Sequence, residues 1–204
     1  MNHLITTTIA LTLSASAALA GLQTSGSVNI DIPGDFTGVF IDIQTGSFST
    51  VDDSDFQSSD VNFFFGGSGV ANGPSFQPVR TGVGNLDPIA NLAPGTVVDS
   101  SLLLATGFGG SENTHIGLDL DQFQLGEVGF LGFHIDIAGE LHYGCMRVDL
   151  GNVGEPGMVL DWVYNDTPGM GVTVVPEPGH YAMIIGLAGI SALAVYRRKR
   201  KFAA

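Results

Sequence analysis

Basic residues are almost absent from most of this chain. The first 196 residues contain no lysine and only two arginines, Arg80 and Arg147. All twenty acidic residues lie between Asp31 and Glu177, and this stretch therefore carries a net charge of −18. Phosphate groups are bound by clustered lysine and arginine side chains. The charge balance thus excludes nucleic acid as a partner of the central region.

Cysteine and several catalytic signatures are also scarce or missing. Cys145 is the only cysteine, so no disulfide can form within the chain and the fold must depend on its apolar core. The central region has no lysine for a P-loop, no G-x-S-x-G motif around Ser68 and no close histidine pair for zinc. Only Trp162 and four tyrosines are available for stacking against sugars. These absences favour a non-enzymatic role.

The N-terminal residues have the pattern of an export signal. Residues 4–13 form an apolar stretch that is too short to span a membrane, and the A-x-A pattern Ala18-Leu19-Ala20 precedes Gly21. We therefore predict a signal peptide at 1–20, cleaved between Ala20 and Gly21, and prefer it to an uncleaved helix. Secretion follows from this prediction.

A second apolar stretch lies near the C-terminus, at about 180–196. Its seventeen residues include no acidic or strongly basic side chain, and as a helix they would extend ~26 Å, enough for a transmembrane span when flanking side chains snorkel. Five basic residues follow directly: Arg197, Arg198, Lys199, Arg200 and Lys201. By the positive-inside rule they act as a stop-transfer signal and leave the acidic region outside. A tail that binds DNA or lipid is the competing interpretation.

A proline-rich tetrapeptide separates the acidic region from this span. Its residues are Val175, Pro176, Glu177 and Pro178, and its two prolines favour an extended, accessible conformation. The order of this motif, an apolar helix containing Gly186-Leu187 and a basic cluster resembles the PEP-CTERM sorting domain, here 175–204. The resemblance implies sorting by an exosortase, a membrane-embedded cysteine protease or transpeptidase of Gram-negative bacteria that make exopolysaccharide. It also implies that the anchor is temporary.

Between these segments, residues 21–174 alternate apolar and polar side chains in the manner of strands. Turn-forming clusters such as Gly66-Gly67-Ser68-Gly69 interrupt the alternation. The predicted fold is an all-β ectodomain, a β-sandwich or jelly roll, followed by one C-terminal transmembrane helix. The alternating apolar sets are Val28/Ile30/Ile32, Val39/Ile41/Ile43, Val61/Phe63/Phe65 and Ile116/Leu118/Leu120.

One hairpin can be aligned from the sequence. If Gly139-Glu140 form the turn, Leu131 faces Val148, Phe133 faces Met146 and Ile135 faces Gly144, which places the apolar side chains on one face. The other face then pairs His134 with Cys145 and Asp136 with Tyr143. A thiolate nucleophile is one interpretation of that face. The preferred interpretation is that these are ordinary strand residues that face the solvent.

Acidic loops suggest a cation site or a pair of catalytic carboxylates. Either Asp52-Asp53 with Asp55, or Asp119 with Asp121, could serve a glycosidase or a calcium site. Asp52, Asp53 and Asp55 lie in one polar loop and are our first candidates for calcium. Solvated acidic loops are the simpler interpretation. Asn165-Asp166-Thr167 matches a glycosylation sequon but is interpreted as turn chemistry.

The sequence as a whole predicts a cell-surface or extracellular-matrix protein of the envelope, biofilm or exopolysaccharide. It would be exported through the inner membrane, anchored transiently, and processed by an exosortase, with no required cofactor apart from the candidate calcium. The alternative is a secreted protein that binds carbohydrate or hydrolyses polysaccharide, its site formed by acidic residues and exposed aromatic rings.

Overall fold

The computed structural model describes residues 21–102 and 105–175. The chain divides into two units, Met1–Val174 and Val175–Ala204. The predicted signal peptide with Ala20, the motif residues Pro176, Glu177 and Pro178, the predicted span and the basic cluster at 197–201 lie outside the described residues. Among the residues that are described, no helix is long and apolar enough to cross a membrane.

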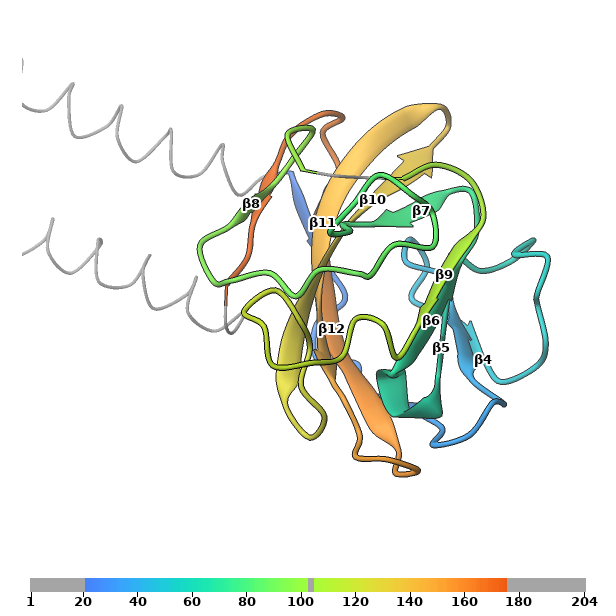
Figure 1. Cartoon of the computed structure of the whole chain (residues 1–204). Coiled ribbons are helices and arrows are strands. Elements are labelled where there is room, and N and C mark those ends of the chain that lie inside the picture. The colour runs from blue at the N-terminus through green and yellow to red at the C-terminus, as the bar shows by residue number, and fades with distance from the viewer. Residues whose placement is uncertain (1–20, 103–104, 176–204) are drawn as a thin grey trace, which may run out of the picture. The chain divides into compact units, whose positions relative to one another are not determined.

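The described residues form an all-β domain, as the alternating pattern predicts, and the paired strands within it run antiparallel. The larger sheet has six strands in the order β1-β12-β11-β10-β7, and β2 also pairs with β12. Three long strands form its centre (Figure 1). The strands of this sheet are β1 (Leu22–Thr24), β2 (Ile30–Ile32), β7 (Phe76–Pro78), β10 (Val128–Ile137), β11 (Glu140–Asp149) and β12 (Gly157–Asn165).

A second sheet has five strands in the order β4-β3-β5-β6-β9, and a third consists of β8 and β13 alone. A single 3-10 turn, η1 (Phe65–Gly67), connects β5 to β6. The five-stranded sheet contains β3 (Val39–Ile41), β4 (Phe48–Ser49), β5 (Val61–Phe64), β6 (Gly69–Asn72) and β9 (Gly109–Glu112). The small sheet pairs β8 (Val97–Val98) with β13 (Val172–Thr173).

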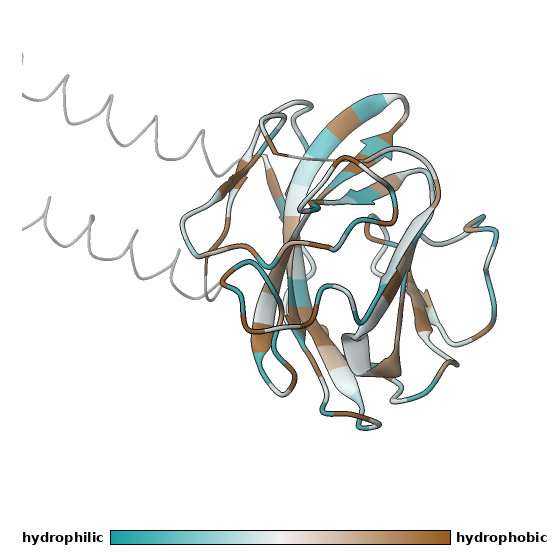
Figure 2. Ribbon diagram, viewed as in Figure 1, coloured by the Kyte–Doolittle hydropathy of each residue, from teal (hydrophilic) through white to brown (hydrophobic). Residues whose placement is uncertain are grey.

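The main core lies between the six-stranded and five-stranded sheets, and brown bands along the strands mark its apolar residues (Figure 2). Phe76 and Phe133 stack within it, with ring centroids 4.9 Å apart. The indole Nε1 of Trp162, on β12, donates to the carbonyl of Ile43 just beyond β3, at 3.0 Å. A side chain of one sheet therefore binds the backbone next to the other, which fixes how the two sheets face each other.

The hairpin of β10 and β11 forms, but its predicted alignment is wrong by two residues. Leu131 pairs with Met146, Phe133 with Gly144 and His134 with Tyr143. The turn is Ala138-Gly139, whose φ angles of 56° and 87° are those of a type I′ turn. A shift of two preserves which side chains face the core, because strand side chains alternate with period two. The apolar face was therefore predicted correctly and the partners were not.

The alternation at 116–120 does not form a strand. Leu118 and Leu120 are fully or almost fully exposed, at 91% and 102%. The segment is instead a loop, closed by a bridge between Ile116 and Phe123 and by the donation of the Phe123 amide to the carbonyl of His115 at 2.8 Å. A short alternating segment forms a strand only if a neighbouring strand provides hydrogen-bond partners for its backbone. Here the backbone partners come from within the loop itself.

Candidate functional site

The outer face of the β10–β11 hairpin is buried, contrary to the solvent-facing interpretation. His134 and Cys145 are 8% and 5% exposed, and a second apolar cluster covers this face. That cluster includes Val98 on β8 and Val172 on β13, so the small sheet packs over the hairpin on the side opposite the five-stranded sheet. Burial lowers the pKa of His134, and the nearby Asp136 carboxylate opposes this effect.

The observed pairing also shows that Cys145 and His134 are not the cross-strand partners that the sequence predicts them to be. Cys145 pairs with Gly132, whereas the ring of His134 contacts Tyr143 edge to face with centroids 6.3 Å apart. Asp136 is exposed at the end of the strand, where its Oδ1 accepts a hydrogen bond from the Gly139 amide at 2.7 Å. The carboxylate thus stabilises the turn, and the three residues do not form a nucleophile, base and orienting acid.

The candidate calcium loop is organised by its own hydrogen bonds. The carboxylate of Asp53 accepts from the Ser59 hydroxyl at 2.6 Å and from the amides of Gln57 and Ser58 at 3.1 Å. These bonds, with the Ser59 hydroxyl contributing most, lower the pKa of Asp53. Asp52 accepts from the Ser54 amide at 3.0 Å. Both carboxylate oxygens of Asp53 and one of Asp52 therefore shape the loop itself.

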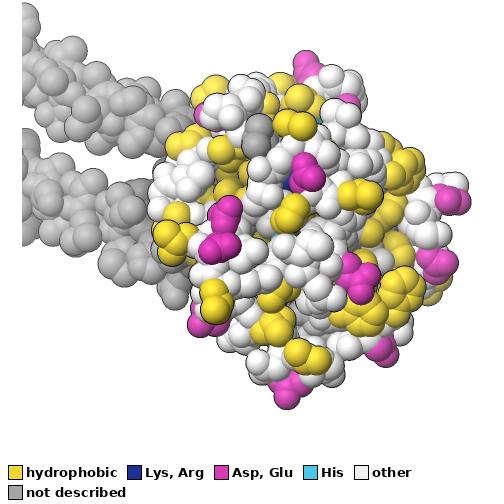
Figure 3. Space-filling view, in the orientation of Figure 1, with side chains coloured by type: hydrophobic (Ala, Val, Ile, Leu, Met, Phe, Trp, Pro, Cys, Tyr) yellow, Lys and Arg dark blue, Asp and Glu magenta, His cyan; other side chains and the backbone are white. Residues whose placement is uncertain are grey.

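The described residues contain no group of three or more histidine, cysteine, aspartate or glutamate side chains that could hold a metal ion. Asp52, Asp53 and Asp55 are therefore not brought together as ligands, and the calcium prediction gains no support from this loop. Acidic side chains are instead scattered singly over the visible face of the domain (Figure 3). This is the arrangement expected of a solvated acidic surface.

A serine and a histidine that the sequence did not indicate meet in the interior. Ser111 on β9 and His115 in the following loop are 6% and 2% exposed, and Ser111 Oγ lies 2.8 Å from His115 Nδ1. His115 Nε2 lies 3.3 Å from the carbonyl oxygen of Gly67. With the proton on Nε2, that nitrogen donates to Gly67 and Nδ1 accepts from the serine hydroxyl. Burial lowers the pKa of His115 to about 4.

This pair has the donor and acceptor order of a nucleophile and its base, but its surroundings suit a structural role. The neighbouring cavity is small and is lined mainly by apolar side chains, including Phe63, Phe123 and Leu131. The described structure places no carboxylate on the histidine, since its two ring nitrogens contact Ser111 and Gly67. The pair therefore fastens the 113–123 loop to η1 across the core.

A second buried polar network surrounds Arg80, which is 2% exposed. Its Nη1 donates to the carbonyl of Asp87 at 2.6 Å, and its Nη2 donates to Asn72 Oδ1 at 2.9 Å. The side-chain amides of Asn72 and Gln77 both donate to the carbonyl of Gly107, at 3.3 and 2.9 Å. Burial lowers the pKa of Arg80, and Asp87 opposes this shift. The arginine thus organises the long loops between β7 and β9.

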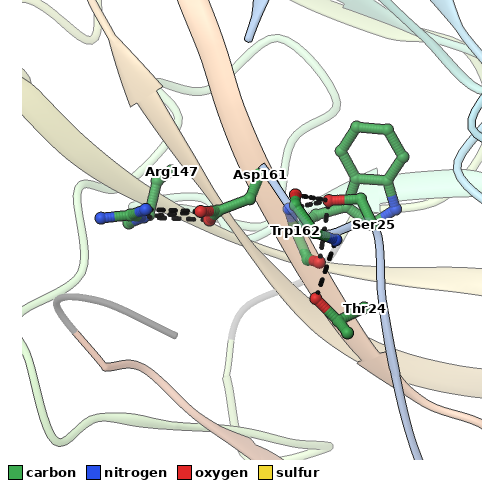
Figure 4. Close-up of polar contacts among 6 residues, drawn as sticks. Thr24, Ser25, Arg147, Asp161 and Trp162 are labelled. Atoms are coloured by element: carbon green, nitrogen blue, oxygen red, sulfur yellow. Dashed lines mark hydrogen bonds and ion pairs between the residues drawn. The ribbon is translucent and has the colours of Figure 1, made fainter. Parts of the chain in front are cut away.

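The other arginine of the domain pairs across β11 and β12. Arg147 Nε donates to Asp161 Oδ1 at 2.9 Å, and Nη2 also donates to the same carboxylate (Figure 4). Beside this pair, Ser25 and Trp162 exchange two hydrogen bonds, in which the Ser25 amide donates to the Trp162 carbonyl at 3.0 Å and the Trp162 amide donates to Ser25 Oγ at 2.9 Å. Trp162 itself is 3% exposed. It is therefore unavailable for stacking against a sugar at the surface.

Both predicted processing points lie directly beside the folded domain. Gly21 immediately precedes β1, and its carbonyl accepts from the Asp166 amide at 2.6 Å. At the other end, the Val174 amide donates to Thr96 and its carbonyl accepts from Gly95, both at 2.8 Å. Val174 is fully buried, and Val175 is the last described residue. The backbone is thus fixed to within one residue of the proline-rich motif.

Comparison of the chain with models of known protein families, with curated proteins and with solved structures finds no match.

Proposed function

We propose that this chain is a PEP-CTERM-type surface protein, exported through the inner membrane and sorted by an exosortase to the cell surface or extracellular matrix. Its ectodomain, residues 21–174, is a non-enzymatic β-sandwich that serves in the envelope, biofilm or exopolysaccharide. The segment 175–204 holds the precursor in the inner membrane until the enzyme acts at or near Pro176, Glu177 and Pro178.

The observation that carries this proposal is where the fold ends. Val172 and Val174 complete the second apolar cluster, and Val174 makes the last interior backbone hydrogen bonds. The proline-rich motif begins with the next residue, Val175. A cut at this motif would therefore remove the anchor and leave every described strand in place. The sequence joins a complete domain to a removable tail.

The interior of the domain supports a structural role for it. Its three histidines, its cysteine and its tryptophan are all buried, and the described polar clusters connect loops to the core. The two apolar clusters lie on opposite sides of the long strands. This arrangement of packed sheets is consistent with a sandwich to which the small β8–β13 sheet is added.

Carbohydrate binding is a second candidate, because several aromatic rings are exposed to solvent and the most exposed of them, Phe36, is supported by other rings. Phe36 is 74% exposed, and its ring contacts those of Phe64 and Phe65 with centroids 5.4 and 5.7 Å away. A supported, exposed ring can stack on the apolar face of a sugar. Loss of exopolysaccharide co-sedimentation in Phe36→Ala, but not in the control Leu118→Ala, whose aliphatic side chain is even more exposed, would support this candidate. Equal co-sedimentation of both variants would remove it.

Intact-mass analysis of surface and membrane fractions tests the main proposal. In cells that contain the exosortase, we expect surface material to start at Gly21 and to lack Arg197, Arg198, Lys199, Arg200 and Lys201. In cells without the enzyme, the membrane fraction should retain these residues. Surface material that still carries the basic cluster would contradict processing and leave a simple single-span protein.

Glu177→Ala provides the matched variant, since it removes the only charge of the motif. We expect the precursor of this variant to accumulate in the membrane fraction. Glu155→Ala, an exposed acidic residue of the domain, is the control and should be processed as the unmodified chain is. Unchanged fractionation of Glu177→Ala would indicate that the motif acts only as a spacer.

A further inference from the structure

We propose that the structure contains a binding site for the chain's own mature N-terminus, formed by side-chain oxygens of Asn165, Asp166 and Thr167 around Gly21. The proposal rests on cleavage between Ala20 and Gly21, which is part of the proposed function, and adds a role for the Asn165-Asp166-Thr167 turn. The ligand is the α-ammonium group that cleavage creates.

The geometry at Gly21 carries the argument. A Cβ atom built on this glycine would lie 2.7 Å from Asn165 Oδ1, 3.0 Å from Thr167 Oγ1 and 3.1 Å from Asp166 Oδ1. The first of these distances is too short for carbon against oxygen. All three, however, are normal for an N–H donor and an oxygen acceptor, and an ammonium group has three such donors. The position thus suits a nitrogen and excludes a side chain.

A freed terminus can place its nitrogen at that position without moving the strand. The Gly21 carbonyl is held by the Asp166 amide at 2.6 Å, and rotation about the Cα–C bond leaves the carbonyl fixed. In glycine, one of the two Cα hydrogens occupies the position that Cβ has in other residues. Rotation about the Cα–C bond can therefore move the nitrogen into that position, and a hydrogen takes the place that the nitrogen leaves. While residue 20 is attached, the nitrogen is an amide with one donor. Only the cleaved chain can therefore fill all three contacts.

Hydrolysis supplies the group with balanced chemistry. Water adds to the Ala20 carbonyl, the Ala20–Gly21 C–N bond breaks, and the Gly21 nitrogen takes up protons to become an ammonium, while Ala20 leaves as a carboxylate.

The three residues around Gly21, which we call the cradle, are held in place independently of the terminus. Asn165 Oδ1 accepts a hydrogen bond from the Thr167 amide at 3.0 Å, and Asp166 Oδ2 accepts one from Gln23 Nε2 at 2.8 Å. Asp166 Oδ1 remains directed at Gly21. Capture of an N-terminal amine by backbone and side-chain acceptors is a known recognition mode.

The scarcity of lysine makes the test specific. In the exported chain, the α-amino group is the only amine before Lys199, and trypsin releases it on the peptide 21–80 because Arg80 is the first basic residue. The full exported protein is treated with an amine-acylating ester at pH 7, and the labelling rate of this peptide is followed by mass spectrometry. The same protein unfolded in urea provides the reference rate.

We expect the folded protein to be labelled roughly tenfold more slowly than the unfolded one, because charge-assisted hydrogen bonds favour the ammonium over the reactive amine. Asp166→Asn keeps the shape of the side chain and removes its charge. The folded variant should therefore be labelled almost as fast as the unfolded protein. Asp121→Asn, an exposed carboxylate on a distant loop, is the matched control and should leave the protection unchanged.

Three outcomes would overturn the proposal, and each has a different meaning. A mass that places the N-terminus elsewhere than Gly21 would contradict both the predicted cleavage and the proposed binding of the ammonium group. A correct start at Gly21 with equal labelling rates in folded, unfolded and Asp166→Asn protein would contradict the cradle alone. Protection that persists in Asp166→Asn would show that the terminus is merely shielded by packing, which also overturns the proposed ammonium contact.

Discussion

At the scale of single residues, the polar side chains that matter most in this domain are buried ones. His115, His134 and His142 are all less than 9% exposed, and Arg80 is enclosed by Asn72 and the carbonyl of Asp87. A buried polar group is costly unless it is hydrogen-bonded, so the hydrogen bonds of His115, His142 and Arg80 restrict the segments that they contact. The loops of this protein are therefore fixed by specific polar partners as well as by apolar packing.

The buried His115 predicts a loss of stability in mild acid. Its pKa is about 4 in the folded domain against 6.5 for an unperturbed histidine, so the unfolded chain binds a proton between these values that the native state does not. Its contribution is present above pH 6.5 and is lost as the pH falls toward 4. The loss is on the order of 3 kcal/mol. Urea denaturation at a series of pH values measures it.

His115→Gln isolates this contribution because glutamine does not titrate. The variant should be less stable at pH 7 by about 1–2 kcal/mol, since it loses buried hydrogen bonds, but its stability should depend less on pH between 6.5 and 4. His134 has a lowered pKa as well, so part of the slope should remain. An identical pH slope in His115→Gln and the unmodified protein would contradict this account.

At the scale of elements, the β10–β11 turn shows what determined the pairing. The ring of Phe133 lies over Gly144, where a Cβ atom would collide with it, so this cross-strand pair requires the glycine. The alignment that satisfies it places Ala138 at a φ of 56°, a left-handed conformation that alanine rarely adopts. Packing on the strand therefore outweighed the local preference of the turn.

The strained turn predicts a stabilising substitution. Asn-Gly is the preferred sequence of a type I′ turn, so Ala138→Asn should increase the free energy of unfolding by about 0.5–1 kcal/mol. Gly139→Ala, at a φ of 87°, should instead lower it by about 1–2 kcal/mol. Chemical denaturation of both variants measures these changes. Destabilisation by Ala138→Asn would show that the turn does not have this geometry in solution.

The C-terminal strand β13 predicts where the domain can be shortened. A chain that starts at Gly21 and stops after Val175 should be as stable as one with the complete tail, because no described strand is lost. Stopping after Gly171 removes Val172 and Val174, which are 2% and 0% exposed, and should cost on the order of 3 kcal/mol. The fluorescence of Trp162, the only tryptophan, follows unfolding in both cases. Equal midpoints would contradict a structural role for β13.

At the scale of the whole molecule, charge repulsion is the dominant long-range force. Residues 21–175 contain nineteen acidic side chains and two arginines, a net charge of −17. Arg147 is paired with Asp161 and Arg80 is buried, so positive charge at the surface is small. Self-repulsion of this kind destabilises a compact state and is screened by salt.

This charge predicts that salt stabilises the domain without a specific ion. The melting temperature should rise with sodium chloride, since ions screen the repulsion between carboxylates. Calcium and magnesium chloride at equal ionic strength should raise it equally, because Asp52, Asp53 and Asp55 do not form a ligand group. A larger shift with calcium would revive a specific site, and Asp53→Asn would then identify the loop.

The sequence by itself determined the all-β class of the domain and which apolar side chains of the β10–β11 hairpin face the core. Alternation with period two is a local property, so Leu131, Phe133 and Ile135 could be assigned to the core without knowledge of their partners. The same property explains the error in pairing, since any shift by two residues leaves the faces unchanged. The failure at Leu118 and Leu120 has a related cause, because alternation cannot reveal whether a neighbouring strand exists.

Only the tertiary structure decided what covers the outer face and which polar groups meet. The small sheet joins Val98 to Val172 across more than seventy residues, and its burial of His134 and Cys145 depends on that distant pairing. The contact of His115 with the Gly67 carbonyl, and the three oxygens around Gly21, likewise arise where segments distant in the sequence converge. Sequence spacing specifies conformation along the chain, but convergence depends on how separate elements pack against each other.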